Sequence, residues 1–150
     1  MARTPSTMIA LGTKAPDFVL PDTVSGTELS LENIKGKIAT VIMFICNHCP
    51  FVKHVNEELV KLANDYKSKG IGFVAINSND IINHPDDSPV LMTVVAKRLN
   101  IHFLTCTMNH RKQQKAMRPL ALPIFLFMIK IFDSSIVDSW MIVAREMKYL

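Results

Sequence analysis

Two cysteines three positions apart are the residues in this chain whose type and spacing point to chemistry. Cys46 and Cys49 lie in the sequence Cys46-Asn47-His48-Cys49, and Pro50 follows directly. Two thiols at this spacing can close a disulfide, and the thiolate is the form of cysteine that reacts. The free N–H groups and the positive end of a helix stabilise a thiolate, and a protonated His48 would favour it further.

A buried strand and a helix are the elements that would position these thiols. The apolar run from Ile38 to Ile45 predicts a buried strand that leads into the cysteines. Pro50 predicts the first turn of a helix, and apolar residues continue at helical spacing as far as Lys69-Gly70: Val52, Val55, Leu59, Leu62 and Ala63. Residues 71–76 are the next predicted strand. A strand–helix–strand unit of this length implies a parallel pair with a right-handed crossover.

Shorter elements precede and follow this unit. Phe18–Leu20 and Thr27–Leu29 predict two short strands, joined by a turn around Pro21–Gly26. Ser30–Asn33 begins a helical turn. Further along, Ser88-Pro89 fits the N-cap and first position of a helix that runs to Arg98.

The loop after the second long strand carries polar side chains. Asn77-Ser78-Asn79-Asp80 follows that strand at its carboxyl end, where α/β proteins place the loops that face a ligand. Asp80 is therefore a candidate proton acceptor near the thiols. We expect His84 at a loop surface and His102 at a strand edge, rather than as ligands.

Two other interpretations of the cysteine pair compete with thiol redox chemistry. A zinc-binding module would use Cys46 and Cys49 with His48 or His54. A structural zinc site normally has a second pair of ligands at standard spacing, which this chain lacks. Free cysteines are also often inert members of a hydrophobic core. The strand, the Cys-x-x-Cys and the helix-opening proline together favour a redox site.

The composition predicts a single cytoplasmic domain. The chain has 150 residues, three cysteines and a net charge of +4. No apolar stretch is long enough for a transmembrane helix, and the opening residues are too short and polar for a signal peptide. In a reducing compartment a Cys-x-x-Cys is more often catalytic than structural. We expect no cofactor, and neither a membrane nor a nucleic acid as a partner.

Residues 12–103 resemble the redoxin branch of the thioredoxin fold, the peroxiredoxin group of alkyl hydroperoxide reductases and thiol-specific antioxidants. The resemblance depends on these motifs: Ala15-Pro16-Asp17-Phe18, Leu20-Pro21-Asp22, Lys35-Gly36-Lys37 and Phe44-Ile45-Cys46-Asn47-His48-Cys49-Pro50-Phe51-Val52. Three longer stretches, FICNHCPFVKH, INSND and HPDDSPVLM, are similar to a thioredoxin-like subgroup with this CNHC sequence. The resemblance implies an α/β, thioredoxin-like fold and an antioxidant or disulfide-exchange function.

The resemblance implies two mechanisms that differ in which cysteine attacks. In peroxiredoxins the peroxide-attacking cysteine precedes a proline, which would be Cys49, with Cys46 where Thr or Ser is usual. In thioredoxins the first cysteine of the motif is the exposed nucleophile, which would make Cys46 attack and Cys49 resolve. Because both thiols are present, we favour a thiol–disulfide oxidoreductase with Cys46 attacking, and place peroxidase second. Its partners would be proteins with thiols or disulfides, or a peroxide; the sequence does not identify the reducing partner.

Residues 104–150 depart from the family. Residues 1–103 hold ten Lys/Arg and ten Asp/Glu and are therefore neutral. Residues 104–150 hold seven Lys/Arg and three Asp/Glu, so they supply the whole net charge of +4. A thioredoxin-like fold should continue with a strand opening on a cis-proline, a hairpin partner and a final helix, and these signals are missing in order. We expect the fold to be incomplete at this end, and the chain to be unstable and poorly active.

A lost nucleotide near the codons for Phe103-Leu104 would explain this tail. After such a loss, each original codon consists of the last base of one present codon and the first two bases of the next. Methionine and tryptophan have single codons, so several pairs of present residues must then decode as an acidic residue. The pairs that give Asp are Trp140-Met141, Met141-Ile142 and Met128-Ile129, and those that give Glu are Met108-Asn109 and Met147-Lys148. With permitted codons elsewhere, the shifted text resembles the missing half of the family, including a Thr-Pro. The alternative is a divergent tail in which Leu120–Phe132 forms a core strand or leans on a membrane, although it is too short to span one. Cys106 lies in this tail and receives no role.

Sequencing the coding DNA across the codons for His102–Cys106 tests this interpretation. We predict that one base is missing relative to an intact copy of the gene. An uninterrupted reading frame at this place in related genes, with the same tail, would contradict it.

Overall fold

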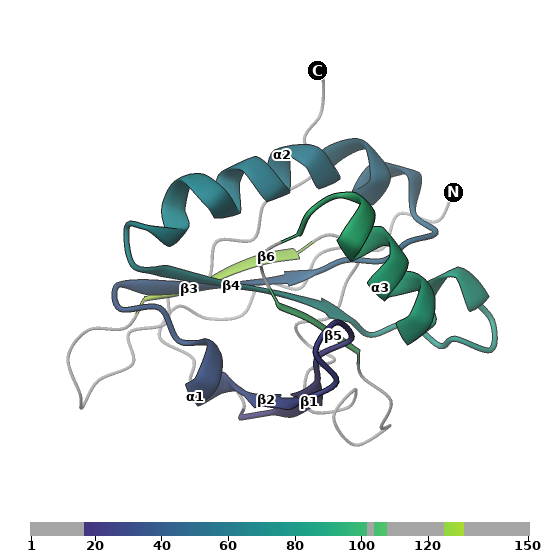
Figure 1. Ribbon diagram of the computed structural model, residues 1–150, viewed down its shortest axis with the longest axis horizontal. Coiled ribbons are helices and arrows are strands. Elements are labelled where there is room, and N and C mark those ends of the chain that lie inside the picture. Colours follow the sequence, from purple (N-terminus) through teal and green to yellow (C-terminus); the bar gives the residue numbers. More distant parts are fainter. Residues whose placement is uncertain (1–16, 102–103, 108–124, 131–150) are drawn as a thin grey trace.

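The computed structural model describes residues 17–101, 104–107 and 125–130, which form an α/β arrangement (Figure 1). The elements follow one another as β1 (Val19–Pro21), β2 (Glu28–Ser30), α1 (Leu31–Ile34), β3 (Ala39–Phe44), α2 (Pro50–Lys67), β4 (Ile71–Asn77), the 3₁₀ turn η1 (Pro85–Asp87), α3 (Pro89–Arg98), β5 (Leu104–Thr107) and β6 (Phe125–Lys130). The elements predicted between residues 18 and 98 are confirmed, with ends that differ by one or two residues.

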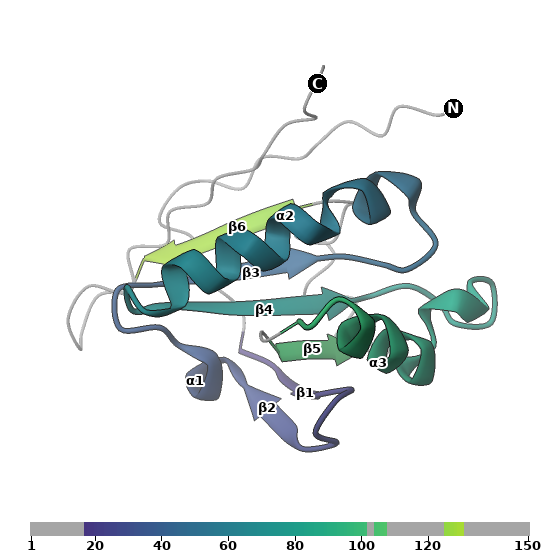
Figure 2. The ribbon, with the colours of Figure 1, turned by 45° about the horizontal axis from the view of Figure 1, so that its top comes forward.

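The main sheet has the strand order β5-β4-β3-β6 (Figure 2). β3 pairs with β4 in parallel, with Ala39 opposite Ile71, and β4 pairs with β5 in parallel. β6 runs antiparallel to β3 along the other edge. The parallel β3–α2–β4 unit predicted from the sequence is therefore present.

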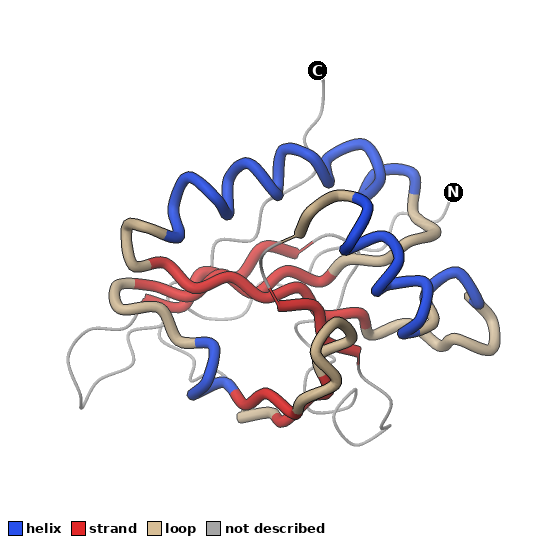
Figure 3. Tube along the Cα trace, in the orientation of Figure 1, coloured by secondary structure: helices blue, strands red, loops and turns tan. Residues whose placement is uncertain are grey.

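The sheet lies between two layers, which explains the uniformly apolar central strand. α2 covers one face, and α1 with the β1–β2 hairpin lies on the opposite side (Figures 1 and 3). All six residues of β3 are buried. A strand covered on both faces has a continuous hydrophobic sequence rather than an alternating one.

No helix in the described part of the chain is long and apolar enough to cross a bilayer.

Local signals explain where the helices begin and end. Ser30 caps α1 in a capping box, in which its hydroxyl accepts from Asn33 N and Asn33 Oδ1 accepts from Ser30 N. α2 and α3 each begin on a proline. Proline is tolerated there because the N–H groups of the first helical turn make no hydrogen bond within the helix, so the N–H that proline lacks is not needed. Gly70, with φ of +79°, turns the chain between α2 and β4.

The stretch that the sequence analysis interpreted as out of frame supplies two strands of the sheet. β5 pairs with β4, and β6 comes from the Leu120–Phe132 run and pairs with all six residues of β3. The apolar composition of that run suits it to this position beside the central strand. Both edges of the β3–β4 pair are thus occupied, although the sequence predicted a fold that is incomplete at this end. The final helix and the cis-proline expected after Phe103 would lie in residues that the structure does not describe. The lost nucleotide stays a prediction.

Two glycines allow the chain before β3 to lie against the start of β4. A Cβ atom built on Gly36 would lie 2.2 Å from Gly72 N and 2.2 Å from Ala39 O. A Cβ on Gly72 would lie 2.3 Å from Ile34 O. All these neighbours are backbone atoms, which cannot rotate away, so no larger residue fits at either position.

We predict that Gly36→Ala lowers the free energy of unfolding by about 3 kcal/mol, because the added methyl forces two backbone segments apart. Gly26→Ala is the matched control: nothing lies within 4 Å of its Cβ, although its φ is +73°. Its cost should be only about 1 kcal/mol, from the left-handed backbone. Urea unfolding followed by circular dichroism measures both. Wild-type stability in Gly36→Ala would contradict the close approach.

Candidate active site

The carboxyl end of β3 delivers both cysteines to the N-terminus of α2. Cys46 comes two residues after β3 ends at Phe44, and Cys49 is the N-cap of α2, with Pro50 as the first helical residue. Ile45 N donates to Ile76 O over 3.1 Å, so the chain stays tied to β4 up to the residue before Cys46. Both cysteines are free thiols.

The two thiols differ in their surroundings. Cys46 is 7% exposed and packs in the core with Val52, Ala63 and Phe73, whereas Cys49 is partly exposed. Burial raises the pKa of the Cys46 thiol to about 11, and the negative charge of Asp87 adds to this rise. The hydrogen bond from Cys49 N–H acts in the opposite direction and lowers the pKa of Cys46. The sequence-based expectation that Cys46 is the exposed cysteine at the helix end is wrong. Cys49 occupies that position because α2 begins only at Pro50.

A buried carboxylate, that of Asp87, holds the loop between the cysteines. Asp87 is the last residue of η1, and its side chain is fully buried. Its Oδ1 accepts from Asn47 N at 2.7 Å and from His48 N at 3.2 Å. Its Oδ2 accepts from Asn79 Nδ2 at 2.8 Å and lies 2.6 Å from His48 Nδ1. Four donors on two loops therefore meet at one carboxylate.

Three asparagine side chains connect the same segments. Asn77 Nδ2 donates to Asp87 O and Asn47 Nδ2 donates to Asp86 O, each over 2.9 Å. Asn79 N donates to Asn77 Oδ1 over 2.9 Å. The side chain of Asn79 also hydrogen-bonds to Cys46. The loops after β3 and β4 and the turn η1 are thereby joined into one polar framework beneath the thiols.

His48 lies between this framework and the surface. Its ring stacks on that of His84, with centroids 4.1 Å apart and planes inclined by 7°. His84 is exposed, as predicted, but it is also part of the site through this stacking. His54 is exposed on α2 and belongs to no group of potential metal ligands among the described residues, whereas Cys46, His48 and Asp87 form such a group. His102 lies outside the described residues.

Asp80, the carboxylate chosen from the sequence, is used within its own turn. Its Oδ1 accepts from Ile82 N and its Oδ2 from Asn83 Nδ2, at 2.9 and 2.8 Å. Asp87 instead contacts the thiol loop. Asp87 was not among the residues assigned chemistry from the sequence, although it lies within the stretch HPDDSPVLM. The signal available was a pair of carboxylates in the loop after β4, at the ligand-facing edge of the sheet.

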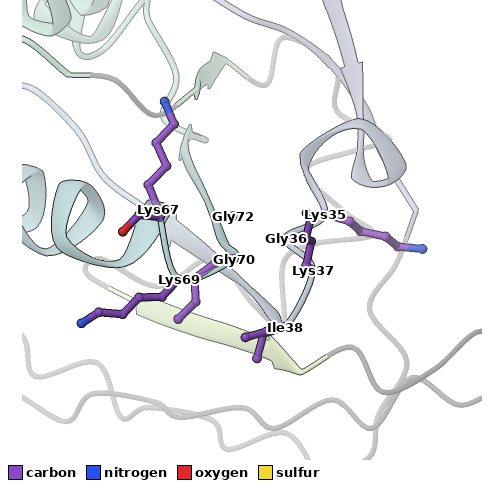
Figure 4. A pocket seen from close by; sticks show the side chains of 10 residues that line it. Lys35, Gly36, Lys37, Ile38, Lys67, Lys69, Gly70 and Gly72 are labelled. Atoms are coloured by element: carbon purple, nitrogen blue, oxygen red, sulfur yellow. The ribbon is translucent and has the colours of Figure 1, made fainter.

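A pocket at the opposite end of the sheet carries four lysines. Lys35, Lys37, Lys67 and Lys69 line it together with residues just before β3 and around the start of β4. The amino groups of Lys35, Lys67 and Lys69 point away from one another (Figure 4). These charges do not converge on one position, so the pocket is not built to hold a small anion.

Comparison with known proteins places this geometry in a family. The Redoxin family model matches residues 10–118, and the chain belongs to the Redoxin family. The match extends past Phe103 into the tail. The chain also has a thioredoxin-like fold, which its similarity to solved structures supports.

Three solved structures show the similarity. An uncharacterized conserved protein from Geobacillus kaustophilus is 41% identical, with 92% of this chain and 72% of that chain covered and a TM-score of 0.80. A hypothetical protein from Sinorhizobium meliloti 1021 is 34% identical, with 85% and 69% covered and a TM-score of 0.76. A putative thioredoxin from Neisseria meningitidis is 26% identical, with 77% and 71% covered and a TM-score of 0.60.

A curated relative is more distant. A probable phospholipid hydroperoxide glutathione peroxidase from Mesembryanthemum crystallinum is 28% identical over 88 residues. That alignment covers 58% of this chain and 51% of the relative. The chain thus spans about half the length of the curated relative that it matches.

We predict that the alkylation rates of the two thiols depend differently on pH. Iodoacetamide is applied at pH values from 6 to above the pKa of Cys46, which is about 11, and peptide mass spectrometry measures the modification of each cysteine. Cys49 should react faster than Cys46 at neutral pH because it is the more exposed thiol, whereas the rate at Cys46 should keep rising until the pH passes about 11. Asp87→Asn should move the Cys46 transition to lower pH, because it removes a negative charge that disfavours the thiolate. Asp65→Asn, at an exposed position on α2, is the control. A Cys46 transition that Asp87→Asn leaves unchanged would contradict the electrostatic role of Asp87.

Proposed function

We propose that this redoxin is a thiol–disulfide oxidoreductase that uses Cys46 and Cys49 as its dithiol. The observation that supports this most directly is the placement of both free thiols between β3 and α2, one buried and one accessible. A disulfide exchange needs both properties: a thiol that a substrate can reach, and a second one held ready to release it.

The geometry favours Cys49 as the thiol that attacks first. It is the more exposed of the two and lies at the N-cap of α2, whereas Cys46 is packed in the core. A buried thiol whose pKa is raised to about 11 is almost wholly protonated at neutral pH and attacks slowly. This order is the reverse of the one favoured from the sequence, in which Cys46 attacks and Cys49 resolves.

The reaction proceeds in two exchanges. The Cys49 thiolate attacks a substrate disulfide, a mixed disulfide forms, and one substrate sulfur leaves as a thiolate. Cys46 then loses its proton and attacks the Cys49 sulfur, which releases the second substrate thiolate and leaves a Cys46–Cys49 disulfide. Two electrons pass to the substrate, and an external dithiol reductant returns them.

His48 is suited to move the proton of Cys46. When Nδ1 donates to the Asp87 carboxylate, the other ring nitrogen is the one that can accept a proton, as in other sites where a carboxylate holds a histidine in one tautomer. One ring nitrogen of His48 lies within 4.8 Å of Cys46 Sγ, a separation that a proton can cross through one water molecule. His48 is half-exposed, so the proton can pass on to solvent.

The substrates that suit this site are proteins with accessible disulfides. The accessible thiol lies at the N-cap of α2, beyond the carboxyl end of β3, where a polypeptide can approach it. A reducing compartment such as the cytoplasm would keep the dithiol ready to act.

Peroxide reduction is the second candidate. One observation favours it: Cys49 is followed by Pro50 at the start of α2, as in the peroxiredoxin pattern. The similarity to a probable glutathione peroxidase points the same way. Cys49 would attack the peroxide oxygen and become a sulfenic acid, an alcohol would leave, and Cys46 would close the disulfide with loss of water. Rapid thiol oxidation by a stoichiometric alkyl hydroperoxide, abolished in Cys49→Ser, would favour this activity.

Trapping the mixed disulfide tests the proposal. We predict that Cys46→Ser accumulates a mixed disulfide between Cys49 and a peptide disulfide, because the resolving thiol is missing. Cys49→Ser should form none, and turnover should fall by on the order of 100-fold or more in both variants, since the two thiols act as a unit. Mass spectrometry identifies the trapped cysteine.

Cys106→Ser is the matched control and should turn over at the wild-type rate. Trapping on Cys46 in the Cys49→Ser variant would restore the order favoured from the sequence. A dithiol that neither forms mixed disulfides nor reduces a peptide disulfide would contradict the proposed function.

A further inference from the structure

Three side chains of different chemistry converge next to the thiol loop. Cys46 Sγ, a ring nitrogen of His48 and a carboxylate oxygen of Asp87 all lie within 4.8 Å of one another. Cys46 and Asp87 are buried, and His48 has a side chain that is 35% exposed. They come from the loop after β3 and from η1, which the asparagine framework joins. The group is therefore held together by the fold and has one side open to solvent.

The chemistry of this group matches a thiophilic divalent cation. Thiolate sulfur, imidazole nitrogen and carboxylate oxygen are the three donor types that bind Zn²⁺ in proteins. A Cys46 thiolate and the Asp87 carboxylate together supply two negative charges, which a divalent cation neutralises. Three protein donors leave a fourth position open to water or another ligand, as in sites where zinc stays accessible.

The carboxylate is already oriented for such a role. Asn47 N and Asn79 Nδ2 donate to its two oxygens and would keep it in place, since each carboxylate oxygen accepts more than one bond. Partners of this kind fix metal ligands in known sites. The competing contact is the 2.6 Å pair between His48 Nδ1 and Asp87 Oδ2, where the cation would replace the shared proton. In a tetrahedral zinc site a nitrogen and an oxygen ligand lie about 3.3 Å apart, so the pair must separate by roughly 0.7 Å, which the partly exposed His48 ring can provide.

We propose that the reduced chain binds one Zn²⁺-like cation through Cys46 Sγ, a ring nitrogen of His48 and the carboxylate of Asp87, and that a Cys46–Cys49 disulfide abolishes this binding. On binding, Cys46 gives up its proton to solvent, and the neutral His48 ring keeps its remaining proton on the nitrogen that faces away from the metal. A disulfide substrate or diamide accepts two electrons, one from each of the two thiolates, and the sulfurs of Cys46 and Cys49 join, so Cys46 can no longer act as an anionic donor. Metal binding by these residues does not depend on the exchange reaction.

Cobalt(II) is the probe that tests the site, because a cobalt–thiolate bond gives a near-ultraviolet charge-transfer band. The full chain is reduced, freed of metal with a chelator and titrated with Co²⁺ in the absence of thiol reagents. We expect one equivalent to bind with a charge-transfer band, and Zn²⁺ to displace it. Protein oxidised beforehand with diamide, with its Cys46–Cys49 disulfide verified by mass spectrometry, should show no band.

Matched variants identify the ligands. His48→Gln and Asp87→Asn should weaken Co²⁺ binding by about 10–100-fold or more, the range seen when groups around a metal are removed. His54→Gln and Asp65→Asn change the same residue types at exposed positions on α2 and should bind as the wild type does. If Asp87→Asn loses its far-ultraviolet circular dichroism, His48→Gln decides alone, since His48 is partly exposed.

Three results would overturn the proposal. The first is the absence of a charge-transfer band at saturating Co²⁺ in reduced protein that has the dichroism of the untreated chain. The second is equal affinity in His48→Gln and His54→Gln. The third is undiminished binding after the disulfide has formed. Each is independent of whether the chain reduces a peptide disulfide.

Discussion

The carboxylate of Asp87 is the group on which the arrangement of the site depends. A buried charge is costly unless hydrogen bonds compensate it, and here four donors do so. Two of them are backbone N–H groups of Asn47 and His48, so the conformation between the cysteines is fixed by a residue far along the chain. That is why the loop after β3 and the turn η1 can act as one unit although they are 40 residues apart.

Burial makes the two thiols unequal, and the same carboxylate adds to the difference. Cys46 lies in the core close to a negative charge, both of which oppose its ionisation, while Cys49 lies at the start of α2 with access to solvent. An exchange site benefits from this difference, because the accessible thiol meets the substrate and the buried one completes the reaction only within the molecule. The shape of the β3–α2 junction produces this division, since the helix begins after the second cysteine rather than the first.

Much of this fold could be predicted from local signals, and much of the site could not. The apolar run of β3, the opening Pro50 and the Ser88-Pro89 pair each act within a few residues, so the sequence revealed the strand and both helices. Asp87 acts across the fold, and the sequence gives no distance between it and Cys46; Asp80, in the loop next to the strand, looked equally suitable. The tail shows the reverse: its composition suggested missing strands, yet its apolar run pairs with β3. An apolar stretch that is compatible with a β-strand can pair with a buried strand such as β3. Composition alone does not show which strand such a stretch will pair with.

The proposed dithiol chemistry requires that Cys46 and Cys49 form one reversible redox couple. A titration of the full chain in glutathione redox buffers, quenched with acid and alkylated for mass spectrometry, measures this directly. We predict a single two-electron transition in which Cys46 and Cys49 disappear together as free thiols and appear as one disulfide. Independent oxidation of the two cysteines, or a disulfide from either of them to Cys106, would contradict it.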